Sequence, residues 1–172
     1  MLSKKMVKAL NEQINKEIYS AYLYMSMSSY SDSIGLKGFA NWFMVQYQEE
    51  MEHAMRFYNY VQEQGEQVTL MAIDQPETKF ASPLALFEKT LEHEKYVTKR
   101  INTLVDQAMK ENDHATRIFL QWFVTEQVEE EANASDIIGK LKLVGKDSSG
   151  LLMVDQELAA RTFTPSLGKG EE

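Results

Sequence analysis

The sequence has no cysteine among its 172 residues. Disulfide bonds, thiolate nucleophiles and cysteine-based metal sites of the zinc-ribbon or rubredoxin type are therefore excluded. The absence of cysteine also fits a reducing compartment, and we expect a cytoplasmic protein.

Long apolar runs are missing, and so is an excess of basic residues. The stretch MLSKKMVKALNEQ becomes charged again before it reaches the length of a signal peptide's apolar segment, and no stretch approaches the roughly 18 apolar residues of a membrane span. Lys and Arg number 18 against 26 Asp and Glu, which gives a formal net charge of −8. Because this charge opposes attraction to phosphate backbones and anionic lipid, we expect neither nucleic acid nor a membrane as a partner.

Helix breakers are few, since the three prolines stand at positions 76, 83 and 165. The long segments between breakers are rich in residues that favour helices. Within them, core-type positions recur at alternating spacings of three and four, which predicts amphipathic helices. Short turns join the first helix to the second and the third to the fourth, so each pair should form an antiparallel hairpin. The sequence predicts an all-α four-helix bundle with helices over about 4–31, 37–64, 83–111 and 114–144.

A long connection, residues 65–82, separates the two hairpins. It can span up to about 60 Å when extended, whereas a helix of the predicted length measures about 42 Å. The connection can therefore run the whole length of the bundle as a crossover strap. We expect its apolar residues to lie along the helices: Val68, Leu70, Met71 and Ile73.

A short fifth helix is predicted after the linker from Gly145 to Gly150. In the segment LLMVDQELAARTF, the apolar residues Leu151, Val154 and Leu158 share one face. We place this helix at about 149–161. With no repeat, low-complexity tract or second composition, residues 1–172 are expected to form a single domain whose bundle covers about 4–144.

Polar residues interrupt each of the four apolar stripes near its middle and at matching depth. Removing each carboxylate from water costs several kcal/mol, whereas a whole domain is stable by only about 5–15 kcal/mol. No Lys or Arg stands on the stripes at that level, so we expect the compensating charge to come from divalent cations and not from the chain. The interrupting residues are Glu17, Glu50 with His53, Glu94, and Gln127 with Glu130.

The spacing of these residues suits a pair of metal ions. Residues three apart on a helix point the same way, so Glu50 and His53 can reach one ion together. Glu17 and Glu94 enter singly from other helices. Oxygen-dominated ligation with one imidazole favours iron or manganese.

These residues, with the long crossover and the fifth helix, closely resemble the ferritins, in particular the non-haem ferritins of bacteria. The resemblance covers nearly the whole chain. Ferritin-like di-iron proteins place one Glu on each of two helices and a Glu-x-x-His motif on each of the other two. Here the second helix carries Glu50-x-x-His53, but the fourth carries Gln127-x-x-Glu130. The symmetric two-histidine site is therefore absent, and an asymmetric second site is expected.

The resemblance implies a role for each residue of this layer. Glu17, Glu50 and His53 would hold the first iron, and Glu50 would bridge to a second iron. Glu94 and Glu130 would hold that second ion, with Gln127 beside it. Two irons per centre are implied.

An adjacent third iron site is also implied, made by Glu49, Glu126 and Glu129 and completed by Glu130. The residues alone leave the alternative open, because acidic runs such as EQVEEE usually form a solvated face. Tyr24 resembles the family's tyrosine near the centre, an electron donor or hydrogen-bond partner.

Tyr24, Trp122 and Met51 each allow a second interpretation. Ordinary bundle packing is the alternative for Tyr24 and Trp122. Met51 stands where bacterioferritins carry their haem methionine, but non-haem ferritins can have it too, so haem is not expected.

The function implied by the resemblance is iron storage. Fe(II) would be oxidised by dioxygen or peroxide at the dinuclear centre, and Fe(III) would be kept as a mineral inside a shell of twenty-four identical subunits. One alternative is a non-storing di-iron or di-manganese oxidase or peroxidase of the same superfamily, which would be small and hold about two metals per chain. The other is a metal-free structural bundle, which would tolerate Glu50→Ala.

Overall fold

The computed structural model describes residues 2–165, which form five α-helices and no strand. The predicted all-α class and helix order are confirmed, and the four long helices match the expected bounds to within two residues. The fifth helix begins one residue earlier than expected and ends three residues earlier. The single-domain assignment over 1–172 stays a prediction. The helices are α1 (Lys4–Ser33), α2 (Lys37–Glu63), α3 (Pro83–Lys110), α4 (His114–Val144) and α5 (Ser148–Leu158).

Side-chain caps begin most of these helices. The Ser3 hydroxyl accepts a hydrogen bond from the Met6 amide at 3.0 Å, and Ser82, followed by Pro83 at the first helical position, caps α3. The α2 helix has no such cap of its own. Its Phe39 amide donates instead to the Asp155 carboxylate of α5 at 3.0 Å. The fifth helix therefore stabilises the start of the second.

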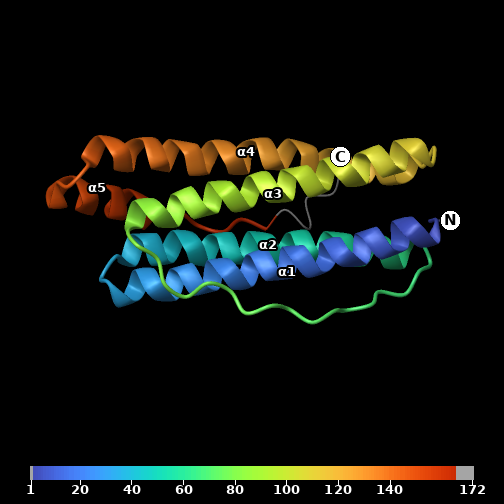
Figure 1. Cartoon of the computed structure of the whole chain (residues 1–172), viewed down its shortest axis with the longest axis horizontal. Coiled ribbons are helices and arrows are strands. Elements are labelled where there is room, and N and C mark those ends of the chain that lie inside the picture. Colours follow the sequence, from blue (N-terminus) through green and yellow to red (C-terminus); the bar gives the residue numbers. More distant parts are fainter. Residues whose placement is uncertain (1, 166–172) are drawn as a thin grey trace.

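Two antiparallel hairpins, α1–α2 and α3–α4, lie against each other to form the bundle (Figure 1). The connection between them runs along α1 from one end of the bundle to the other, as a crossover strap. The short α5 packs at one end against α2 and α4. Across residues 2–165, none of the helices is long and apolar enough to cross a membrane.

Hydrogen bonds from α1, and not apolar burial, hold most of the strap. The Asn15 amide donates to the Ala72 carbonyl at 2.9 Å and the Tyr30 hydroxyl to the Phe80 carbonyl at 2.7 Å. Val68 packs on the core as expected. The other apolar strap residues also belong to the segment that runs along α1, but an extended segment over a single helix covers only one side of its residues. Leu70, Met71 and Ile73 are exposed.

The apolar core is divided in two along the bundle. One cluster surrounds Phe43 and Phe87 toward the α5 end, and the other surrounds Phe57 and Ile101 toward the N-terminal end. The predicted stripes of α1 and α2 are fully buried. The buried face of α3 is rotated relative to the stripe predicted from the sequence, because two helices, α1 and α4, pack against α3. Leu84, Leu91, Thr98 and Val105 are only partly buried, and Leu86, Thr90, Val97 and Leu104 take the core.

Candidate metal centre

Ionisable side chains fill the waist between the two apolar clusters. The exposed fractions of Glu17, Glu50, His53 and Glu94 are 1%, 2%, 4% and 1%, and that of Glu130 is 5%. They come from four different helices, one or two from each. These values rule out a solvated acidic face at this level. The polar layer predicted from the interrupted stripes is therefore present inside the bundle.

Glu17, Glu50 and His53 converge on one point. A ligand atom from each lies within 4.8 Å of the other two, and Glu50 Oε2 is 3.5 Å from His53 Nδ1. One oxygen of Glu17 and one of Glu50 receive no hydrogen bond from the described part of the chain. A buried carboxylate oxygen without a donor is costly. A divalent cation between these atoms would remove that cost.

Glu94 is held by two neutral partners. The Tyr24 hydroxyl donates to one of its oxygens, and the Gln127 amide donates to the other at 3.1 Å. Gln127 also donates to the Glu94 main-chain carbonyl at 3.2 Å. Tyr24 and Gln127 therefore both stand beside the centre, where the sequence placed them.

Burial raises the pKa values of the carboxyl groups in this layer. Desolvation first, and then the charge of a neighbouring carboxylate, raise the pKa values of Glu17, Glu94 and Glu130 to about 8. Desolvation and Glu130 raise the pKa of Glu50 well above its ordinary value. Without a bound cation the layer resists ionisation, because several negative charges would share one dry space. A cation at this point would reverse that balance.

The four residues predicted for a third site lie on the same flank but are not all together. His53, Glu126 and Glu130 bring ligand atoms within 4.8 Å of one another. Glu129 is exposed and belongs to neither close group found among the described residues. Glu49 is half-buried and pairs with Arg161 at 2.5 Å. His53 thus lies between the first group and this one.

Two glutamines that contact the carboxylates were not predicted as site residues. Gln13, fully buried on α1, donates to Glu17 at 2.8 Å. Gln46 on α2 donates to Glu130 at 2.8 Å and to Glu50 at 3.5 Å. Gln46 lies three residues after Phe43 and four before Glu50, so it shares their helix face, and this spacing was a usable signal. Gln13 stands off the predicted α1 stripe, and nothing in the sequence marked it.

An arginine holds each of these glutamines by its side-chain oxygen. Arg100 donates to Gln13 at 2.9 Å, and Arg161 donates to Gln46 at 2.8 Å. Two arginines thus lie one residue away from the layer, but they contact neutral amides and not its carboxylates. That the compensating charge comes from cations stays a prediction. These arginines lie 87 and 115 residues from their partners in the sequence. The apolar stripes did not indicate these arginines, because each stripe belongs to a single helix and the arginines approach from other elements.

Trp122 packs beside the centre. Its ring lies edge-on to His53 with centroids 5.3 Å apart, and the Arg56 guanidinium lies 3.9 Å from its ring centroid. These contacts hold the His53 imidazole against the core. They are contacts of ordinary bundle packing by Trp122. Tyr24 likewise packs on Phe43, with centroids 6.1 Å apart, in addition to bonding Glu94.

Comparison with known proteins agrees with this geometry. The family model described as a ferritin-like domain matches residues 7–144, so the chain belongs to the ferritin-like family. The bacterial non-heme ferritin of Campylobacter jejuni is 47% identical over 156 residues, covering 91% of this chain and 93% of that protein. The bacterial non-heme ferritin of Staphylococcus saprophyticus is 44% identical over 166 residues, covering 96% and 99%.

Solved structures that match this chain are also ferritins, and their sequence identity to it is higher. An open-pore ferritin from the hyperthermophilic archaeon Archaeoglobus fulgidus matches with a TM-score of 0.94 and 59% identity, over 94% of this chain and 100% of that one. A humanized archaeal ferritin matches with a TM-score of 0.95 and 59% identity, over 96% and 100%.

Proposed function

We propose that this chain is the subunit of an iron-storage ferritin that oxidises Fe(II) within its bundle and keeps Fe(III) as a mineral inside a hollow assembly. The observation that carries this function is the set of buried carboxylates at the bundle's waist, which includes oxygens that no hydrogen bond satisfies. Relatives named bacterial non-heme ferritin, 47% and 44% identical over nearly the whole chain, support it.

The first iron would be held by Glu17, Glu50 and His53, which already converge. Glu50 would bridge to a second iron held by Glu94 and Glu130. Gln127 is neutral and is occupied by hydrogen bonds to Glu94. The second ion would therefore meet three carboxylates, those of Glu50, Glu94 and Glu130, but no imidazole of its own.

The chemistry needed from the chain is electrostatic. Carboxylate ligands stabilise Fe(III) more than Fe(II), which lowers the reduction potential and favours oxidation. Two Fe(II) ions lose one electron each, and one dioxygen molecule with two protons accepts both electrons to give hydrogen peroxide. With peroxide as the oxidant, the same two electrons and two protons give two water molecules. Ferroxidase activity follows from the family, and the choice between these oxidants is a prediction.

Oxidised iron must leave the centre for storage, and the weak second site suits this transfer. Glu126 and Glu130, with Glu49 and Glu129 near them, would form a third site toward which iron moves. His53 would serve both the pair and this site, since it belongs to both close groups, and Glu130 would be shared between the second iron and this site. Each chain would then hold at most three iron ions at these sites, and these ions would be on their way to storage.

The storage function requires self-assembly, and the chain forms a homo-oligomeric shell. We propose twenty-four subunits. Exposed apolar side chains follow α1 and the strap, including Tyr22 at 47%, Met25 at 37% and Ile73 at 41%. A face of this kind is covered in an assembly. Haem is not part of this proposal, and a cytoplasmic location stays a prediction.

Aerobic loading with Fe(II), followed by sizing and iron counting per particle, tests the function. A storage protein elutes as a very large particle and retains far more iron than its binding sites can hold. A non-storing oxidase retains about two metals per chain and elutes as a small species. That second result would contradict the storage function.

Glu50→Ala and His53→Ala test the centre itself. Either change should slow Fe(II) oxidation by about 10²-fold, since a ligand to the reacting ion is lost, while the particle size stays the same. Stopped-flow absorbance of Fe(III) formation measures the rate. Met55→Ala, an exposed change on the same helix, is the matched control. An unchanged rate of Fe(II) oxidation in both ligand variants would contradict the assignment of the centre to these residues.

A further inference from the structure

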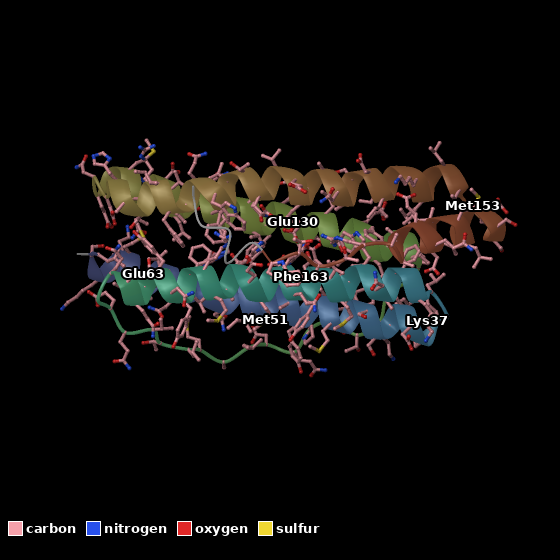
Figure 2. All side chains as sticks on the ribbon, turned by 180° about the vertical axis from the view of Figure 1, so that it is seen from behind. Lys37, Met51, Glu63, Glu130, Met153 and Phe163 are labelled. Carbon is pink, nitrogen blue, oxygen red and sulfur yellow. The ribbon has the colours of Figure 1, made fainter. Side chains whose placement is uncertain are left out.

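The chain after α5 turns back along the bundle and brings Arg161 to the third-site flank. Asn41 on α2 anchors this return by donating to the carbonyls of Leu158, Ala159 and Arg161, at 3.3, 3.3 and 2.9 Å. In Figure 2 the label of Phe163 stands over the middle of α2, on the side facing Glu130. We call residues 159–165 the C-terminal arm. The arm thereby places Arg161 against Gln46 and Glu49 of α2.

The Arg161 guanidinium makes four contacts with three residues of α2. Its guanidinium lies over the Trp42 ring, 4.5 Å from the centroid. One terminal nitrogen donates to the Trp42 carbonyl at 3.4 Å and to the Gln46 side-chain oxygen at 2.8 Å. The other donates to Glu49 Oε2 at 2.5 Å. With exposed side-chain fractions of 21% for Arg161 and 26% for Glu49, this ion pair is shielded from water on most sides.

The contact with Gln46 fixes which way its amide points. Because the Gln46 oxygen accepts from Arg161, its NH₂ group is directed toward the layer, where it donates to Glu130 Oε2 at 2.8 Å. The same NH₂ group lies 3.5 Å from Glu50 Oε1. Arg161 thus acts on two candidate ligands through Gln46 and on a third, Glu49, directly.

We propose that Arg161 is a positioning residue that competes with a third metal ion for Glu49. This inference rests on the proposed function, because it assigns Glu49 to the third site. A cation that binds Glu49 Oε2 must displace the guanidinium, because Arg161 donates to that oxygen. A cation at the other oxygen would be repelled by the positive charge beside it. The ion pair therefore weakens the third site and keeps Glu49 ordered until a cation arrives. When the guanidinium leaves, the Trp42 ring and the Gln46 amide lose their partner together.

Titration of the metal-free assembly with Zn(II) tests the competition without any redox step. Zn(II) accepts oxygen and imidazole ligands and does not change oxidation state. Calorimetry counts the ions bound per chain and separates the buried pair from the weaker third ion. Arg161→Gln should raise the affinity for the third ion by about ten-fold, because a charge-assisted hydrogen bond no longer has to be broken, and leave that of the pair unchanged.

Trp42 supplies a second readout. In a Trp122→Phe background, Trp42 is the single tryptophan of the chain. Its fluorescence should change only as the third ion binds, because that is when the guanidinium leaves its ring. In Arg161→Gln the same step should be silent. If Arg161 only supported the fold, the change in Trp42 fluorescence would not coincide with binding of the third Zn(II) ion per chain.

Three further variants make the test specific. Arg117→Gln, which removes the same charge from an exposed position on α4, should leave all three affinities unchanged. Arg161→Lys, which keeps the charge, should restore most of the competition. In Glu49→Gln the Arg161→Gln change should no longer matter, since the shared carboxylate is gone.

The outcomes separate this inference from the function on which it rests. If the pair fills normally and Arg161→Gln leaves the third ion's affinity unchanged, the competition is overturned and the proposed function stands. If Arg161→Lys behaves like Arg161→Gln, competition by charge is overturned. If native protein binds no Zn(II) at the buried pair, the proposed function and this inference both fail.

Discussion

Single amide groups decide how charge is distributed around the buried carboxylates. Gln13, Gln46 and Gln127 each donate to a carboxylate of the layer. A neutral donor stabilises a buried carboxylate without adding a positive charge that would repel a metal ion. The arginines that orient two of these amides remain one residue further away. The chain thus holds its ligands in place and still leaves the charge balance to the cation.

Gln127→Glu tests this division at one residue. The change should tighten binding of the second metal ion by about ten-fold, because a fourth carboxylate then faces it beside Glu50, Glu94 and Glu130. It should also lower the melting temperature of the metal-free protein by several degrees, because Glu94 loses a donor and gains a repelling neighbour. Zn(II) calorimetry and thermal unfolding measure the two effects. Gln121→Glu, an exposed change on the same helix, is the control. A variant that gains affinity without losing metal-free stability would show that Gln127 does not support Glu94.

At the scale of elements, α5 is fitted to the start of α2 more closely than a loosely attached helix would be. A Cβ atom at Gly38 would lie 1.7 Å from the Asp155 carbonyl oxygen and 2.6 Å from its carbon. The two backbones therefore meet at a position where only glycine fits. The same approach lets the Asp155 carboxylate cap the Phe39 amide. The C-terminal arm depends on this docking, since it begins where α5 ends.

Gly38→Ala should displace α5 and destabilise the protein by about 1–3 kcal/mol, since the backbones must separate. Hydrogen exchange should rise across residues 148–158 while α1 and α3 stay protected. Gly139→Ala is the matched control, because a Cβ there meets nothing within 4 Å, and it should stabilise α4 by roughly 0.5–1 kcal/mol. Equal exchange in α5 for both variants would contradict the tight docking.

Helix type, order and bounds were predictable because they depend on local periodicity. Glu17, Glu50, His53, Glu94 and Glu130 were predictable because a carboxylate or imidazole on an apolar stripe breaks that periodicity. Contacts that arise between elements left no such trace. The rotated α3 stripe and the strap held by polar groups both depend on which neighbour covers a residue.

The same reasoning explains why the arginines were missed. Arg100 approaches from α3 to a glutamine of α1, and Arg161 arrives on the C-terminal arm. Each lies off the stripes and acts through a partner on another element. A sequence shows that a buried charge needs compensation, but the direction from which it comes is a property of the assembled fold.

For the whole molecule, the buried carboxylates set how stability depends on pH in the absence of metal. The pKa values of Glu17, Glu94 and Glu130 are about 8 in the folded protein against an ordinary 4.5. Between these values the folded chain binds more protons than the unfolded chain, so stability falls as pH rises. The contribution is fully present below about 4.5 and is lost as pH passes through about 8. His93 acts in the other direction, since burial lowers its pKa to about 4 from 6.5, but its effect is confined below about 6.5.

Metal-free protein should therefore lose several degrees of melting temperature between about pH 6.5 and 9, a window in which the carboxyl groups titrate and His93 does not. Circular dichroism of the chelated protein at constant ionic strength measures the trend. Glu17→Gln should make the slope shallower, because one of the titrating groups is gone. Glu66→Gln, a change on the strap and outside the buried layer, should leave it unchanged. Zn(II)-loaded protein should show the opposite slope, because bound carboxylates are ionised in the folded state and protons then compete with metal. A metal-free protein that gains stability over this window would mean that these carboxyl groups ionise freely, and the buried layer would then need no cation.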